Sequence, residues 1–67
     1  MSLVEAFAMF RQLGVNVETM KPRDLNISYF ALAKRYHPDR NPQGAELMAH
    51  INAARAAILK SYRNSAS

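Results

Sequence analysis

The 67-residue sequence contains no cysteine, no tryptophan and only two glycines. Without cysteine it can form neither a disulfide nor a thiolate metal site, so side-chain packing has to stabilise the fold. No apolar run approaches the roughly 18 residues of a membrane-spanning helix, and the N-terminus lacks the basic and apolar pattern of a secretory signal. We therefore expect one small domain over residues 1–67. We expect it to be located in the cytoplasm, which is a reducing compartment.

Acidic side chains are also scarce. Five Asp and Glu stand against nine Lys and Arg, which gives a net charge of +4 and a pI near 10.0. The excess falls in residues 21–67, which carry eight basic and three acidic side chains. This imbalance predicts an acidic partner for the later part of the chain.

Residues typical of helix ends occur at intervals in the first half of the sequence. Ser2 followed by Glu5 forms a capping box, and Gly14 suits the left-handed position that ends a helix, so we expect a helix over 3–13. Its apolar stripe consists of Leu3, Ala6, Phe7, Phe10 and Leu13. Pro22 at a first helical position and Pro38 as a stop predict a second helix over 22–36. Its core-facing stripe is Leu25, Tyr29, Leu32, Ala33 and Tyr36.

The stretch 37–44, HPDRNPQG, has the composition of a loop. An alanine-rich third helix is expected over 45–62, followed by a frayed tail over 63–67. Its inner face carries Met48, Ile51, Ala54, Arg55, Ile58 and Tyr62. Two long helices joined by a short loop pack antiparallel, with the first helix expected to lay its apolar stripe against both. The predicted fold is all-α, a small monomeric three-helix domain with an exposed loop at one end.

The residues of this loop carry a motif. His37-Pro38-Asp39 follows Tyr36 at the corner between two helices. The chain around it, from about residue 3 to residue 62, resembles the J-domain, the module of DnaJ-like co-chaperones. The matching segments are Leu13-Gly14-Val15 (LGV), Tyr29 to Asp39 (Y-x-x-L-A-x-x-Y-H-P-D) and Met48 to Leu59 (F-x-x-I-N-x-A-x-x-x-L-L). In the last of these segments, Met48 stands where the family has Phe, and Ile58 stands where it has the first Leu of the final pair.

The resemblance implies a co-chaperone without catalytic activity or cofactor. J-domains dock on a DnaK-type 70-kDa heat-shock chaperone in its ATP-bound state and stimulate its ATP hydrolysis, which assists protein folding. The residues that the resemblance assigns to docking are His37, Pro38, Asp39, Arg35, Arg40, Lys34 and Asn41. Asp39 would offer a carboxylate to a basic group, the basic residues would steer the encounter, and Asn41 is expected to cap the following helix instead.

The sequence departs from the family on the outer face of the second helix. DnaJ-like proteins usually carry a basic run there, whereas the corresponding positions hold Asn26, Phe30 and Ala31. Phe30 is either part of the core or an exposed aromatic anchor for a partner. The sequence leaves both interpretations open.

Other functions fit the sequence less well. A basic three-helix DNA-binding domain would need a short tight turn before a recognition helix rich in Arg, Asn or Gln. A metal site from His37 and His50 has no cysteine and no clustered carboxylates to complete it. An enzyme is not expected, because no nucleophile and base pair can be assigned. A J-like module that serves purely for protein interaction within a larger protein remains an alternative.

Overall fold

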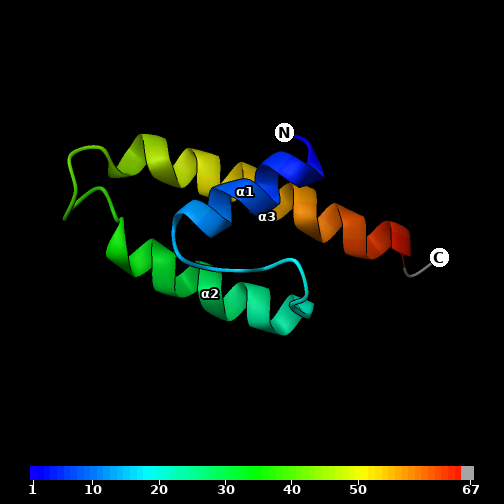
Figure 1. The fold of residues 1–67 in the computed structure, drawn as a ribbon. Helices are drawn as coiled ribbons and strands as arrows, with labels where there is room; N and C mark the ends of the chain where they lie inside the picture. Colours follow the sequence, from blue (N-terminus) through cyan, green and yellow to red (C-terminus); the bar gives the residue numbers. More distant parts are fainter. Residues whose placement is uncertain (66–67) are drawn as a thin grey trace.

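The computed structural model describes residues 1–65, and these residues form three helices and no strand. The helices are α1 (Leu3–Gln12), α2 (Pro22–Arg35) and α3 (Gly44–Ser65). Figure 1 shows α2 and α3 running antiparallel on either side of a loop, with α1 lying on α3. The expected all-α, three-helix architecture is therefore confirmed.

Local signals in the sequence fix both ends of α1. The Ser2 hydroxyl accepts a hydrogen bond from the Glu5 N–H at 3.2 Å and donates one to the Glu5 carboxylate at 3.0 Å. At the other end Gly14 has φ +85°, the Gly14 N–H bonds the Arg11 carbonyl, and the Val15 N–H bonds the Phe10 carbonyl. These two bonds around a left-handed glycine are a Schellman motif. It ends the helix at Gln12, one residue before the predicted end, with Leu13 as the C-cap.

The core lies where the three helices meet. Its fully buried side chains are Ala6, Phe10, Val17, Leu25, Leu32, Ile51, Ala54 and Ile58. Phe7 and Met48, which were expected in the core, are partly buried at its margin, whereas Leu3 of the predicted stripe is 38% exposed. Val17 comes from the segment between α1 and α2, so this connection is packed into the domain.

Several predicted helix boundaries need correction. α1 and α2 end at Gln12 and Arg35, each one residue before its predicted end. α3 begins at Gly44 and continues to Ser65, so residues 63–65 of the expected tail are helical, while 66 and 67 lie outside the described residues. The helix continues because neither glycine nor proline interrupts it after Gly44.

The apolar stripe of the first helix was expected to lie against both others. Among the described residues the α1 backbone comes close to α3 and not to α2, but Phe10 shares one buried core with residues of both helices. Leu25 and Leu32 of α2 reach the same core through their side chains.

Polar side chains join α2 to α3 beside this core. The Tyr29 hydroxyl donates to the Asn52 Oδ1, and the Arg55 guanidinium donates to the Asn26 Oδ1 at 2.9 and 3.2 Å. The Arg55 guanidinium also stacks over the Tyr29 ring, 4.8 Å from its centre. Asn26 therefore faces α3, not the outer surface of α2 as its place in the resemblance suggested. Asn52 of α3 thus has a structural role, because its amide oxygen accepts the bond from Tyr29.

The last turns of α3 hold the segment that precedes α2. The Tyr62 hydroxyl donates to the carbonyl oxygen of Met20, 42 residues earlier in the chain. Partial burial, and secondly the Asp24 carboxylate, raise the pKa of Tyr62 above its ordinary value of 10.0. Tyr62 therefore stays a neutral donor to Met20.

Candidate functional site

A tight turn forms the corner between α2 and α3. α2 ends at Arg35, and the N–H of Tyr36 still bonds the Leu32 carbonyl at 2.9 Å. The His37 carbonyl then accepts from the N–H groups of Arg40, at 2.9 Å, and Asn41, at 3.0 Å. This bonding leaves Pro38 and Asp39 at the two central positions of the turn, where the fixed φ of proline is favourable.

The side chains at this turn point into solvent. The side chain of His37 is 58% exposed and that of Asp39 is 89% exposed. The His37 Nδ1 accepts from the Asp39 N–H at 3.2 Å and lies 3.5 Å from the Asp39 Oδ2. One carboxylate oxygen is therefore near an imidazole, while most of the Asp39 side chain is available to a partner.

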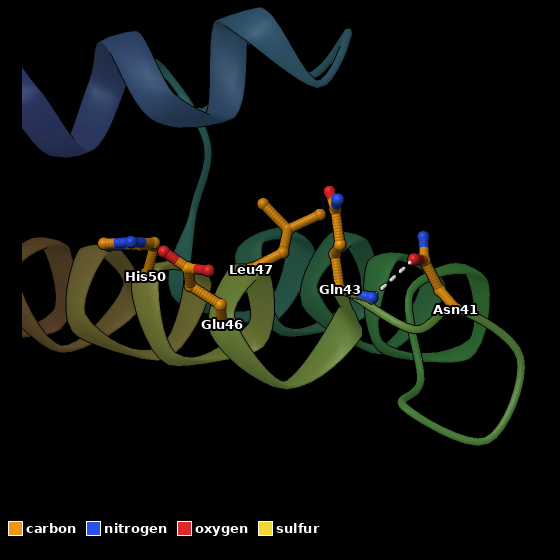
Figure 2. Close-up of a pocket in the computed structure, with 5 residues that line it drawn as sticks. All are labelled: Asn41, Gln43, Glu46, Leu47 and His50. Atoms are coloured by element: carbon orange, nitrogen blue, oxygen red, sulfur yellow. Dashed lines mark hydrogen bonds between the residues drawn. The ribbon is translucent and has the colours of Figure 1, made fainter.

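Asn41 closes the loop ahead of α3. Its Oδ1 accepts from the Gln43 N–H at 3.0 Å, two residues along the chain, and its carbonyl accepts from the Gly44 N–H at 2.9 Å. Figure 2 shows this bond beside a shallow hollow of about 290 Å³ lined by Asn41, Gln43, Glu46, Leu47 and His50. The expected capping role is modified: Asn41 orders the turn just before the helix instead of bonding its first turn.

Gly44 packs against the backbone of this corner. From the sequence it was expected only to be part of the loop. It is buried, and a Cβ at this position would overlap the Tyr36 carbonyl oxygen and lie 3.0 Å from the His37 carbonyl carbon and the Pro38 nitrogen. The start of α3 thus packs directly on the backbone of the motif. The sequence does contain this glycine, seven residues after His37. Its importance could not be predicted, because it depends on the close approach of Gly44 to the Tyr36 backbone in the folded chain.

Three basic side chains surround the corner. Lys34, Arg35 and Arg40 are exposed, and none of them forms an ion pair within residues 1–65. The Arg35 guanidinium stacks on the Tyr36 ring, 5.4 Å from its centre. Lys34, His37 and Arg40 line an open hollow of about 420 Å³, which we call the basic hollow. All seven residues assigned to docking therefore lie at one end of the molecule.

The outer surface of α2 settles the alternative that the sequence left open for Phe30. Phe30 is 61% exposed and so is Ile27, one turn earlier. Phe30 is therefore not a core residue. The exposure of Ile27 was not predicted from the sequence.

Two further features of the described residues concern membrane spans and metal sites. No helix among them is both long and apolar enough to cross a membrane. Within the same residues, no three His, Cys, Asp or Glu side chains gather where they would hold a metal ion.

The sequence is similar to that of a protein from Mycoplasma pneumoniae named DnaJ-like protein MG002 homolog. The two are 44% identical over 41 residues, which are 61% of this chain and 13% of that protein. This similarity supports a J-domain-like relationship for this part of the chain. No protein-family profile and no solved structure matches the chain.

Proposed function

We propose that this chain is a J-domain-like co-chaperone module that docks on a DnaK-type chaperone in its ATP-bound state and stimulates its ATP hydrolysis. The observation that carries the proposal is the exposed Asp39 carboxylate at the apex of a turn held between two antiparallel helices. Similarity to a DnaJ-like protein supports the same assignment. The module acts by binding and performs no chemistry of its own.

Each residue of the corner has a physical role in this proposal. Asp39 pairs with a cationic group of the chaperone, and such a charge-assisted bond is costly to break once water is excluded. Pro38 restricts the turn, so less conformational entropy is lost on docking. Lys34, Arg35 and Arg40 steer the corner towards an acidic face of the chaperone.

The test is single-turnover ATP hydrolysis by a DnaK-type chaperone, with and without this chain. We expect Asp39→Asn to abolish the stimulation and to leave the circular dichroism spectrum unchanged, because the side chain has no core contact. Glu46→Gln is the matched control, since Glu46 is another exposed carboxylate, in the first turn of α3. It should stimulate like the unmodified chain.

Two results would contradict the proposal. Full stimulation by Asp39→Asn would show that the carboxylate is not the docking group. Absence of any stimulation by the unmodified chain, together with tight and salt-dependent binding to duplex DNA, would favour a nucleic-acid-binding domain instead.

A further inference from the structure

The outer face of α2 combines apolar and basic side chains in one stripe. Arg23, Ile27, Phe30 and Lys34 follow one another at steps of four, three and four residues. This spacing places them along one side of a helix, in the pattern by which one helix packs on another. Figure 1 shows α2 at the edge of the molecule, away from α1.

The centre of this stripe is an exposed apolar pair. Ile27 and Phe30 are each 61% exposed, and they are the large apolar side chains that α2 presents to solvent. The Phe30 ring makes an edge-to-face contact with the Tyr29 ring at 5.5 Å, and Tyr29 is itself held by Asn52 and Arg55 of α3. The contact with Tyr29 therefore restrains the Phe30 side chain, so less side-chain conformational entropy is lost when a partner covers it.

The two ends of the stripe are basic. Arg23 lies one turn before Ile27, and Lys34 lies one turn after Phe30 at the edge of the basic hollow. A second copy of this chain would place cations opposite cations if it packed antiparallel on the face. Duplex nucleic acid would match the charges but would gain nothing from the apolar centre. The matching occupant is an acidic protein segment with an apolar centre.

We propose that the outer face of α2 binds an amphipathic acidic helix of another protein, antiparallel to α2. In that orientation the N-terminus of the bound helix meets the basic hollow, and acidic residues are most favourable in the first turn of a helix. Its apolar side chains, one turn apart, then lie on Ile27 and Phe30, whose backbones are separated by about 4.5 Å along the axis. Lys34, His37 and Arg40 receive the acidic first turn.

This binding face does not depend on the proposed ATPase stimulation. It uses Lys34, His37 and Arg40 in common with the corner, but neither Asp39 nor Pro38. The two proposals therefore fail separately: Asp39→Asn should abolish stimulation of a DnaK-type chaperone and leave binding of the helix intact.

The test uses a synthetic helical peptide of about 18 residues, long enough to form helix on binding, with glutamates in the first turn and two leucines one turn apart in the middle. Its binding to the unmodified chain is measured by titration calorimetry and by amide NMR shifts. We expect Phe30→Ser to lower the affinity at least about tenfold, as removal of a central anchor does, and Ile27→Ser to lower it less. Val4→Ser is the matched control, because Val4 is a 77% exposed apolar residue on α1.

Charge exchange tests the orientation. Lys34→Glu should weaken binding of this peptide, and a peptide with lysines in its first turn should bind that variant more tightly than it binds the unmodified chain. Melting temperatures of all the variants should stay within a few degrees of one another, because the altered side chains are exposed. The NMR shifts should be confined to α2 and the corner.

Three results would overturn the proposal. The first is failure of the peptide to bind, or equal weakening by Val4→Ser and Phe30→Ser. The second is a dimer in sedimentation equilibrium that Phe30→Ser dissociates, since the occupant would then be a second copy. The third is retention of peptide affinity by Lys34→Glu, which would remove the acidic helix as the ligand.

Discussion

The centre of the molecule and the corner between α2 and α3 are held together by different means. At the centre, large apolar side chains such as Phe10, Leu25 and Ile51 are completely buried. At the corner, exposed polar side chains surround a turn that is fixed by backbone hydrogen bonds and by the close approach of Gly44. Different residues therefore provide the stability of the fold and the exposed groups of the corner. Substitutions at the centre should lower stability, whereas substitutions of exposed side chains at the corner should change binding.

The strongest test of this separation is Phe10→Ala. Removing a large buried side chain costs about 2–5 kcal/mol, which is comparable with the roughly 3–5 kcal/mol of stability that a domain of this size possesses. We expect the variant to be unfolded or nearly so in a thermal melt followed by circular dichroism. Val4→Ala, which changes an exposed residue of the same helix, is the control and should have the melting temperature of the unmodified chain. An unchanged melting temperature for Phe10→Ala would show that Phe10 is not part of the core.

Gly44→Ala tests whether backbone contact holds the corner. The added Cβ would overlap the Tyr36 carbonyl oxygen, so the loop or the start of α3 must shift. We expect a loss of about 1–3 kcal/mol in unfolding free energy, typical of overpacking. Amide NMR shifts should change across residues 36–44.

The other glycine provides the control for that experiment. Gly14 has a left-handed backbone but nothing within 4 Å of an added Cβ, so Gly14→Ala introduces strain without a clash. Its spectral changes should be confined to the end of α1. Unchanged corner amides in Gly44→Ala would show that the contact does not position the motif.

Tyr62 offers a smaller effect that depends on pH. Because the pKa of Tyr62 is raised in the folded chain, the unfolded chain loses the phenolic proton first as the pH rises past the ordinary value of 10.0. The contribution of Tyr62 to stability is therefore complete below pH 10.0 and falls above it. Urea unfolding at a series of pH values measures this decline.

Tyr62→Phe should make the decline above that pH less steep. At neutral pH it should cost about 0.5–1.5 kcal/mol, the usual worth of one hydrogen bond, here to the Met20 carbonyl. Val4→Ala, which changes an exposed side chain that does not titrate, is the comparison, and it should keep the steeper decline of the unmodified chain. Identical slopes in both variants would mean that Tyr62 is not the group responsible.

The smallest effect on stability is expected for Phe30→Lys, because Phe30 is exposed. This variant should keep its melting temperature and bind a DnaK-type chaperone more tightly, with a steeper dependence on salt, since a charge replaces an apolar group beside Lys34. The unmodified chain should correspondingly bind more weakly, and with less salt dependence, than J-domains that have a fully basic helix. A folded variant with unchanged affinity and salt slope would show that this face takes no part in chaperone docking.

The features predicted correctly from the sequence are those with local causes. Ser2, Gly14 and Pro22 act on their neighbouring backbone, so their signals can be read without knowledge of the fold. The helical spacing of Phe10, Leu32 and Ile51 likewise indicated the core. The exposed position of His37-Pro38-Asp39 followed from the two prolines and the helix on each side.

What the sequence did not predict depends on contacts between distant residues. Burial of Val17, the bond from Arg55 to Asn26 and the bond from Tyr62 to Met20 join segments far apart in the chain, and none leaves a periodic signal. The end of α3 was misjudged because Asn64 and Ser65 have the composition of a tail. The need for glycine at position 44 became visible only through the backbone of Tyr36.

The short contact between His37 and Asp39 has a consequence for the proton of the imidazole ring. Because the Asp39 N–H donates to Nδ1, neutral His37 must be the tautomer with its proton on Nε2, at the opposite edge of the ring. The exposed imidazole therefore offers a partner a hydrogen-bond donor at Nε2, while the exposed Asp39 carboxylate beside it offers acceptors.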